Sequence, residues 1–316
     1  MARVSGEVTQ QISAAVETAR TTRSRTRVAA LLLYAVALLV WIRAFGVPSD
    51  TVQIFVWLWL ATIAWNVEAP WRYHLGFLRD WWAPVAGLVV YFYSRGLADE
   101  FGFTPHFQMP ITVDTWLGGG TLPSEALQGA LCGTPCDPNS DPRWYDVLFT
   151  TVYSTHFVVG LTIAMVLWLR NRGEWIKWMR RYIGANLAAL VVYIFYPMAP
   201  PRMAWEEGYL PHEVLRITHR GWADTGLGRF HLILTGVGNP VAAMPSLHAG
   251  IAFMVAIYGI HRLRTPWRFL LAAYPLVMSF ALVYNGEHYV LDILAGWLLA
   301  SAVLASCSFY ERSRGT

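Results

Sequence analysis

Two histidines stand where apolar stretches begin, near the end of the chain. His248 lies in NPVAAMPSLHAG and His288 lies in YNGEHYVLDILAGW. Asp292 follows His288 by four residues, about one helical turn, so their side chains are predicted to share a helix face. A carboxylate in that position holds an imidazole in one tautomer and favours its cationic form. The pattern predicts a site with two histidines, one of them oriented by Asp292.

These residue types suit chemistry at phosphorus. A neutral His288 can attack phosphorus and carry a phosphoryl group covalently. His248 can donate a proton to the departing oxygen and accept one from the incoming nucleophile. Arg202 can pair with phosphate oxygens through its guanidinium. Pro245 suits a first helical turn, so the backbone N–H groups from Ser246 onward are expected to face an anion. This chemistry requires no metal and no cofactor.

Three further polar residues are candidates for substrate binding, each with a structural alternative. His156 lies inside an apolar stretch, where ionisable residues are usually functional, although a hydrogen bond to a neighbouring helix would explain it equally well. Tyr153, one turn earlier, either faces the same cavity or packs in the core. Asp114 either binds an acceptor hydroxyl or caps a nearby helix. Glu287 is interpreted as a turn residue.

The composition indicates an all-α membrane protein. Hydrophobic residues make up 55% of the 316 positions and charged residues only 14%, whereas soluble domains carry about 25% charged residues. A membrane-spanning helix needs about 20 mostly apolar residues. Eight spans are predicted on this basis. They cover residues 28–47, 52–68, 82–98, 147–169, 180–197, 245–262, 267–284 and 288–309.

The distribution of charge predicts the orientation of these spans. With the N-terminus inside, the inner segments hold most of the Lys and Arg, and the outer segments hold most of the Asp and Glu. Both termini are then cytoplasmic, and Arg202, His248 and His288 all face the outer side of a cell (plasma) membrane. The inner arginines need no nucleic-acid partner, because they suit topology and anionic lipid.

Four parts are predicted along the chain. The N-terminal stretch lacks the short apolar core of a signal peptide and is expected to be cytoplasmic. The predicted parts are a cytoplasmic segment at 1–27, two accessory spans within 28–81, a six-helix catalytic bundle at 82–310 and a cytoplasmic tail at 311–316.

The first long outer segment contains a predicted helix and a cysteine pair. An amphipathic helix is expected near residues 123–131, lying at the membrane interface. Cys132 and Cys136 follow it, and on the outer side of a membrane a disulfide between them is favoured over a zinc site. Cys307 is expected to be a buried apolar residue.

The motifs around both histidines resemble the type 2 phosphatidic acid phosphatase superfamily. NPVAAMPSLHAG and GEHYVLDILAG look like its second and third signature motifs. The SLH form, YPMAPPR, the HYxxD form, DTWLGGG from Asp114 and YSTH from Tyr153 most resemble the branch of the inositol phosphorylceramide synthases. The resemblance implies a helical membrane fold, with His288 as nucleophile, Asp292 as its partner and His248 as general acid in metal-independent transfer.

The chain departs from the superfamily pattern at its cations. The Lys of the first motif is absent, and Arg202 is the nearest substitute. Leu282 stands where an Arg usually precedes the nucleophile. Arg143 and Arg229 are candidates to complete the phosphate site. These departures weaken assignment as a plain phosphatase more than assignment as a transferase.

The sequence thus predicts a membrane lipid phosphotransferase, with three functions kept open. In the first, a phospholipid or polyprenyl-phosphate donor loads His288, and a hydroxyl acceptor takes the transferred group, which the resemblance suggests is similar to inositol phosphate. In the second, water is the acceptor and the protein is a lipid phosphatase. The third is a non-catalytic transporter or scaffold.

Overall fold

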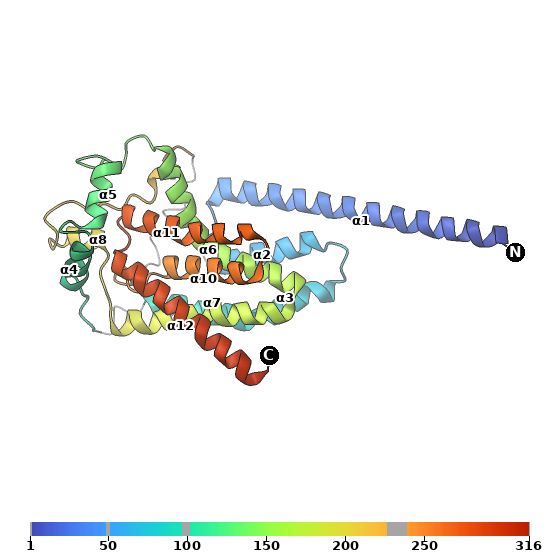
Figure 1. Ribbon diagram of the computed structural model, residues 1–316. Helices are drawn as coiled ribbons and strands as arrows, with labels where there is room; N and C mark the ends of the chain where they lie inside the picture. The colour runs from blue at the N-terminus through green and yellow to red at the C-terminus, as the bar shows by residue number, and fades with distance from the viewer. Residues whose placement is uncertain (1, 49–50, 97–101, 226–238, 316) are drawn as a thin grey trace. The chain divides into compact units, whose positions relative to one another are not determined.

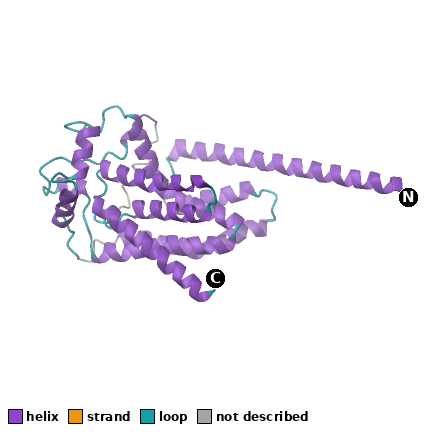
Figure 2. Ribbon diagram, in the orientation of Figure 1, coloured by secondary structure: helices purple, strands orange, loops and turns teal. Residues whose placement is uncertain are grey.

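The computed structural model describes the backbone of residues 2–48, 51–96, 102–225 and 239–315, and side chains over 24–48, 52–96, 102–223 and 239–315. It contains helices and loops and, within these ranges, no β-strand (Figure 2). The prediction of an all-α fold is therefore confirmed. The chain divides into two compact units, Met1–Ala83 and Pro84–Thr316.

The first unit holds α1 (Ala2–Phe45), α2 (Thr51–Trp65) and the first part of α3 (Trp71–Gly96). α1 contacts α2. Trp59 donates a hydrogen bond of 3.0 Å to the carbonyl of His74, and the rings of Phe55, Phe77 and Trp81 pack against one another. Aromatic packing thus joins α2 to the start of α3.

The second unit is a helical bundle around α10 (Leu247–Arg262). α10 contacts α6 (Trp144–Arg170), α7 (Arg172–Phe195), α11 (Ala273–Tyr284) and α12 (Val290–Arg314). Small buried residues on α10, among them Ala249, Gly250 and Ala252, allow these neighbours to approach closely. A 3₁₀ helix, η3 (Pro266–Ala272), leads directly into α11.

Short elements gather at one end of this bundle (Figure 1). They are α4 (Gln108–Leu117), α5 (Pro123–Leu131), α8 (Pro201–Glu206) and the 3₁₀ helix η2 (Arg220–Thr225). α5 matches the helix predicted near 123–131, and Cys132 and Cys136 after it are joined in a disulfide. The N-termini of α10 and α12 also lie at this end, so the short elements are near the predicted site (Figure 1).

Helices occupy all eight segments that were predicted to span the membrane. Four helical stretches are both long and apolar enough to cross a bilayer: Ser24–Phe45, Trp144–Arg170, Pro266–Tyr284 and Val290–Arg314. α2 is apolar but shorter. The protein is therefore a multi-span helical membrane protein, and the number of eight spans stays a prediction.

Candidate active site

The structure brings the two histidines together. The centroids of the His248 and His288 rings lie 5.9 Å apart. His248 is in the first turn of α10, and His288 lies two residues before α12 begins. The Ser246 N–H donates a hydrogen bond of 2.9 Å to the main-chain carbonyl of Asp292, which ties the start of α10 to the start of α12.

Glycine allows the same two helices to cross at close range. A Cβ added at Gly250 would lie 2.9 Å from the carbonyl oxygen of Gly296, and one added at Gly296 would clash with the carbonyl of Ser246. Real Cβ atoms are not found so close to a carbonyl oxygen. The spacing of the two imidazoles thus depends on glycine at both positions.

His288 and Asp292 form the predicted pair, but by a different local geometry. His288 Nδ1 lies 3.2 Å from Asp292 Oδ2. His288 precedes the N-cap residue Tyr289, so it is not on the helix and does not share a helix face with Asp292. Asp292 instead reaches back from the first turn, as in a capping box, and also accepts the Tyr289 N–H at 2.9 Å. The expectation of a shared helix face was wrong, while the pairing itself is present.

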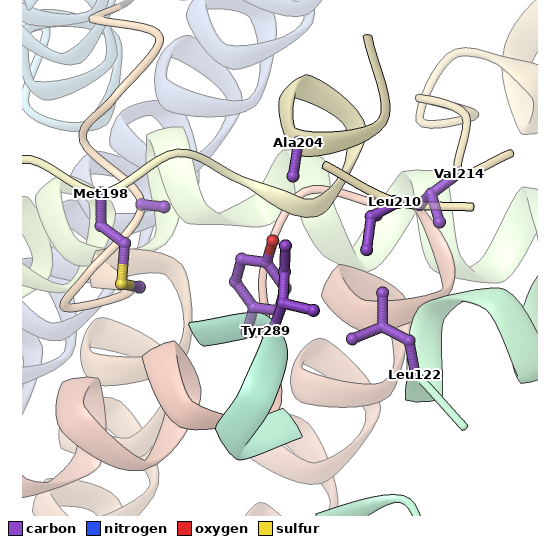
Figure 3. Close-up of a cluster of buried hydrophobic side chains, with 8 residues drawn as sticks. Leu122, Met198, Ala204, Leu210, Val214 and Tyr289 are labelled. Carbon is purple, nitrogen blue, oxygen red and sulfur yellow. The ribbon is translucent and has the colours of Figure 1, made fainter. Parts of the chain in front are cut away.

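Tyr289 anchors the loop that carries His288. Its ring is fully buried in a hydrophobic cluster beside the site (Figure 3). The members of the cluster are Ile111, Leu122, Met198, Ala204, Leu210, Val214, Ala243 and Tyr289. Burial of a large aromatic side chain contributes roughly 2–3 kcal/mol, so this packing fixes the backbone next to His288.

His248 is held between aromatic rings of α6. It stacks on Tyr153 with ring centroids 4.6 Å apart and on His156 with centroids 3.9 Å apart. The Phe157 ring meets it edge-on at 5.7 Å. His248 Nε2 is buried and has no hydrogen-bond partner among the described residues. Tyr153 and His156 therefore contact the His248 ring, and Tyr153 also packs in the buried cluster with Ala249, Met278 and Leu282.

Asp114 has a structural role that the sequence did not reveal. It is fully buried, and its carboxylate accepts the N–H groups of Val290 at 2.7 Å and Leu291 at 3.0 Å. It therefore caps α12, and not the helix at 123–131. Burial raises the pKa of Asp114 to about 6; the two N–H donors oppose this shift, and the nearby Asp292 adds to it.

Arg202 lies on α8 near an acidic residue that sequence reasoning assigned only to a turn. Its Nε and the Glu287 Oε2 are 4.0 Å apart, and its guanidinium is also 4.0 Å from Glu206. Glu287 accepts a shorter hydrogen bond of 2.5 Å from Nε of Arg216. Glu287 directly precedes His288, so it brings two arginines toward the predicted nucleophile.

Two arginines near the histidines were missed in the sequence. Arg216 and Arg95, the latter from the last turn of α3, both lie within electrostatic range of His248. Arg95 was visible only as an isolated cation at the outer end of the predicted third span. Arg216 lies in the long segment between α8 and η2, where no motif pointed to it.

Among the other residues predicted to contact phosphate, Ser246 and Arg143 have partners within the protein. The Ser246 side chain caps α10 by accepting the Ala249 N–H, and its own N–H is used by Asp292, so neither group is open to an anion. Pro245 precedes the helix and does not occupy its first turn. Arg143 caps α6 and donates to the Tyr145 hydroxyl. Arg229 lies outside the described residues.

Comparisons with known proteins point to the same family as the motifs. A family model described as the PAP2 superfamily matches residues 139–306. Phosphoinositol dihydroceramide synthase of Bacteroides thetaiotaomicron is 27% identical over 194 residues, which cover 56% of this chain and 60% of that protein. Inositol phosphorylceramide synthase catalytic subunit aur1 of Schizosaccharomyces pombe is 28% identical over 166 residues, 49% of this chain and 38% of that protein.

The chain thus spans less than two thirds of the length of either relative. No solved structure matches it. The matched family region covers more than half of the chain and contains Arg202, Arg216, both site histidines and Asp292. This agreement confirms the resemblance read from the motifs. The chain belongs to the PAP2 superfamily.

Proposed function

We propose that the protein is an integral-membrane lipid phosphotransferase that works through a phosphohistidine on His288. The observation that carries the proposal is the meeting of the His248 and His288 rings at 5.9 Å, with His288 Nδ1 on the Asp292 carboxylate. Both relatives are named as synthases, of phosphoinositol dihydroceramide and of inositol phosphorylceramide, which supports a lipid substrate and transfer over hydrolysis.

The first half of the reaction uses the Nε2 atom of each imidazole, which for His248 has no hydrogen-bond partner among the described residues. With its Nδ1–H donated to Asp292, His288 presents the Nε2 lone pair to the phosphorus of a phospholipid donor. A nitrogen–phosphorus bond forms as the phosphorus–oxygen bond to the lipid alcohol breaks. A protonated His248 gives its proton to that departing oxygen.

The second half reverses these roles. The hydroxyl of an acceptor attacks the phosphorus, its proton passes to His248, and the bond to His288 breaks. The transferred group, which we infer to be an inositol phosphate or a similar polar head, then sits on the acceptor. Water in place of the hydroxyl acceptor would give a lipid phosphatase, the second candidate. The site is proposed to face the extracytoplasmic side of the plasma membrane.

The test uses the purified protein in detergent micelles with phosphatidylinositol labelled on its phosphate. We expect label to move to an added ceramide acceptor, and His288→Ala to abolish the transfer. Release of water-soluble labelled inositol phosphate without any new labelled lipid would favour hydrolysis, the second candidate. Equal turnover by wild type and His288→Ala would contradict the role of His288 in both reactions. No turnover by either protein would leave a transporter or scaffold as the better explanation.

A second variant tests whether the two histidines have different roles in the reaction. His248→Ala keeps the proposed nucleophile but loses the proton donor for the leaving group. We expect roughly 10²- to 10⁴-fold slower turnover. Acid-labile label on the His248→Ala protein, and none on His288→Ala, would place His248 outside the attack step. If neither variant protein carries label, the result would contradict a covalent intermediate on His288.

A further inference from the structure

This chain lacks the cations that the motifs of its family carry, and a phosphate site needs such charges. A phosphate undergoing displacement develops charge on its non-bridging oxygens, and arginine guanidiniums stabilise that charge through paired hydrogen bonds. Leu282, at the position of the motif arginine, is fully buried in an apolar cluster with Tyr153, Ala249 and Met278. No phosphate contact can come from this side chain, so cations from elsewhere in the fold must serve.

Arg216 is held in place on both sides of its side chain. Its Nε donates to Glu287, the neighbour of His288, and its guanidinium interacts with the hydroxyl of Tyr153, which stacks on His248. Arg216 therefore contacts both Glu287, which adjoins His288, and Tyr153, which stacks on His248. Burial alone lowers the pKa of Arg216, but Glu287 and Tyr153 outweigh this effect, so the net pKa is raised and the guanidinium stays charged.

The backbone around Arg216 is equally fixed. The buried Gln128 accepts the Leu215 N–H at 3.0 Å and donates to the Leu215 carbonyl at 2.7 Å and the Tyr284 carbonyl at 2.9 Å. On the other side, the Ile217 N–H donates to the carbonyl of Asn285. A long loop is thereby tied to α5 and to the end of α11 at the two residues that flank Arg216. Such preorganisation is typical of groups that bind a transition state.

Arg95 approaches the same histidines from α3. It lies within electrostatic range of His156, His248 and Tyr153. Its Nε is buried without a hydrogen-bond partner among the described residues. Its carbonyl accepts a hydrogen bond of 2.8 Å from Asn239, in the segment that leads into α10. The guanidinium is hydrogen-bonded to the Tyr91 side chain, and the unpaired Nε leaves it donor capacity that suits an anion.

We propose that Arg95 and Arg216 bind the non-bridging oxygens of the substrate phosphate, in place of the cations that the superfamily motifs carry. The inference rests on the proposed function and names the residues that neutralise its substrate. Glu287 positions Arg216 and balances its charge, and the entering phosphate shares the guanidinium with it. The site therefore takes a lipid phosphate that is held by two arginines from outside the signature motifs.

The test compares Arg95→Gln and Arg216→Gln with Arg264→Gln, which removes an exposed arginine from the loop between α10 and η3. We expect kcat/KM for the labelled lipid donor to fall roughly 10²- to 10³-fold in each site variant and to stay unchanged in the control. Arg216→Lys, which keeps the charge but loses the planar fork, is expected to lie between them.

A binding readout separates this inference from the proposed function. Orthovanadate, a phosphate analogue, is expected to raise the thermal midpoint of wild type and Arg264→Gln, and to have no such effect on Arg95→Gln or Arg216→Gln. If wild type transfers label but the site variants match Arg264→Gln in kcat/KM and in vanadate response, the inference is wrong and the proposed function stands.

If wild type shows no transfer but its vanadate response is lost in the site variants, the anion site stands without the reaction. If a site variant does not fold, partial recovery of activity in Arg216→Lys supports the inference, and a fully active Arg216→Lys with normal vanadate response overturns it.

Discussion

Asp292 takes part in three interactions within a few ångströms. Its carboxylate contacts His288 Nδ1 and accepts the Tyr289 N–H, while its main-chain carbonyl accepts the Ser246 N–H from α10. The same residue thus orients one imidazole, starts α12 and joins α12 to the helix of the other imidazole. A buried carboxylate stabilises the folded state only when its hydrogen-bond partners are all present, so these interactions depend on one another.

The substitution Asp292→Asn separates the catalytic part of this role from the structural part. The amide oxygen can still accept the Tyr289 N–H, and the main-chain carbonyl is unchanged, so we expect the protein to fold. A neutral amide cannot stabilise the imidazolium form of His288 by its charge, so kcat should fall roughly 10²- to 10⁴-fold. Steady-state kinetics with a thermal melt checks this. A normal kcat would show that Asp292 acts only as a helix cap.

At this scale the sequence revealed local features and missed distant ones. The approach of His288 and Asp292 follows from a spacing of four residues, so it was predictable, although the two lie at a helix start and not along a helix. Arg95 and Arg216 are far from either histidine in the chain, and no local pattern marks them. Glu287 was assigned to a turn, which is correct for its backbone, but its pairing with Arg216 depends on a loop 71 residues away.

The start of α12 is built by a different helix. Asp114 on α4 accepts two N–H groups of α12, which would otherwise be buried without partners. We expect Asp114→Ala to lower the free energy of unfolding by about 1–3 kcal/mol, and to lower activity because the His288 loop adjoins this turn. Denaturant titration in detergent measures the stability, and an unchanged midpoint would contradict the capping role.

The pKa of Asp114 gives this cap a pH dependence. Because the folded pKa, about 6, lies above the ordinary value of 3.8, protonation favours the folded state. The contribution is fully present below about pH 4 and is lost as pH rises through about 6. Relative to Asp114→Asn, the wild type should therefore lose stability across this window. A difference between the two proteins that is constant with pH would contradict the assignment.

The close crossing of α10 and α12 can be tested by adding a methyl group at one of its glycines. Gly296→Ala places a methyl group against the carbonyl of Ser246, so the two helix starts must separate. We expect a loss of about 1–3 kcal/mol in stability and at least tenfold lower activity, since the histidine spacing changes. Gly184→Ala on α7 is the control, because its methyl would meet Val303 at an ordinary 3.5 Å. Similar effects of both substitutions would contradict a special role for this crossing.

Elements were the best-predicted level of the structure. Apolar runs are local in sequence, and helices lie in every predicted span as well as at 123–131. The partners of those helices were not predictable in the same way. Asp114 was expected either to bind an acceptor hydroxyl or to cap a helix within its own segment, whereas it caps a helix that begins 176 residues later. Only the folded chain brings these two elements together.

For the whole molecule, the orientation in the membrane is the main prediction still to be tested. Glu207, after α8, should be outside the cell, and Arg264, between α10 and η3, should be inside; both are exposed. In a Cys307→Ala background, we expect an impermeant maleimide to label Glu207→Cys on intact cells and Arg264→Cys only after permeabilisation. Detergent-solubilised protein should be labelled at both positions. The reverse pattern on intact cells would place the site on the cytoplasmic side.

The bond from Ser246 to the Asp292 carbonyl and the glycine contact behind it leave little freedom between the two helices of the site. The surrounding elements are tied to the helix bundle through buried residues such as Asp114 and Gln128, while exposed positions such as Glu206, Glu207 and Tyr209 face outward. Substitutions at such exposed positions can therefore change which lipid donor or acceptor binds, while the distance between the proton donor and the attacking nitrogen stays constant. Diversification of substrate without retuning of the chemistry is the evolutionary path that this architecture makes easiest.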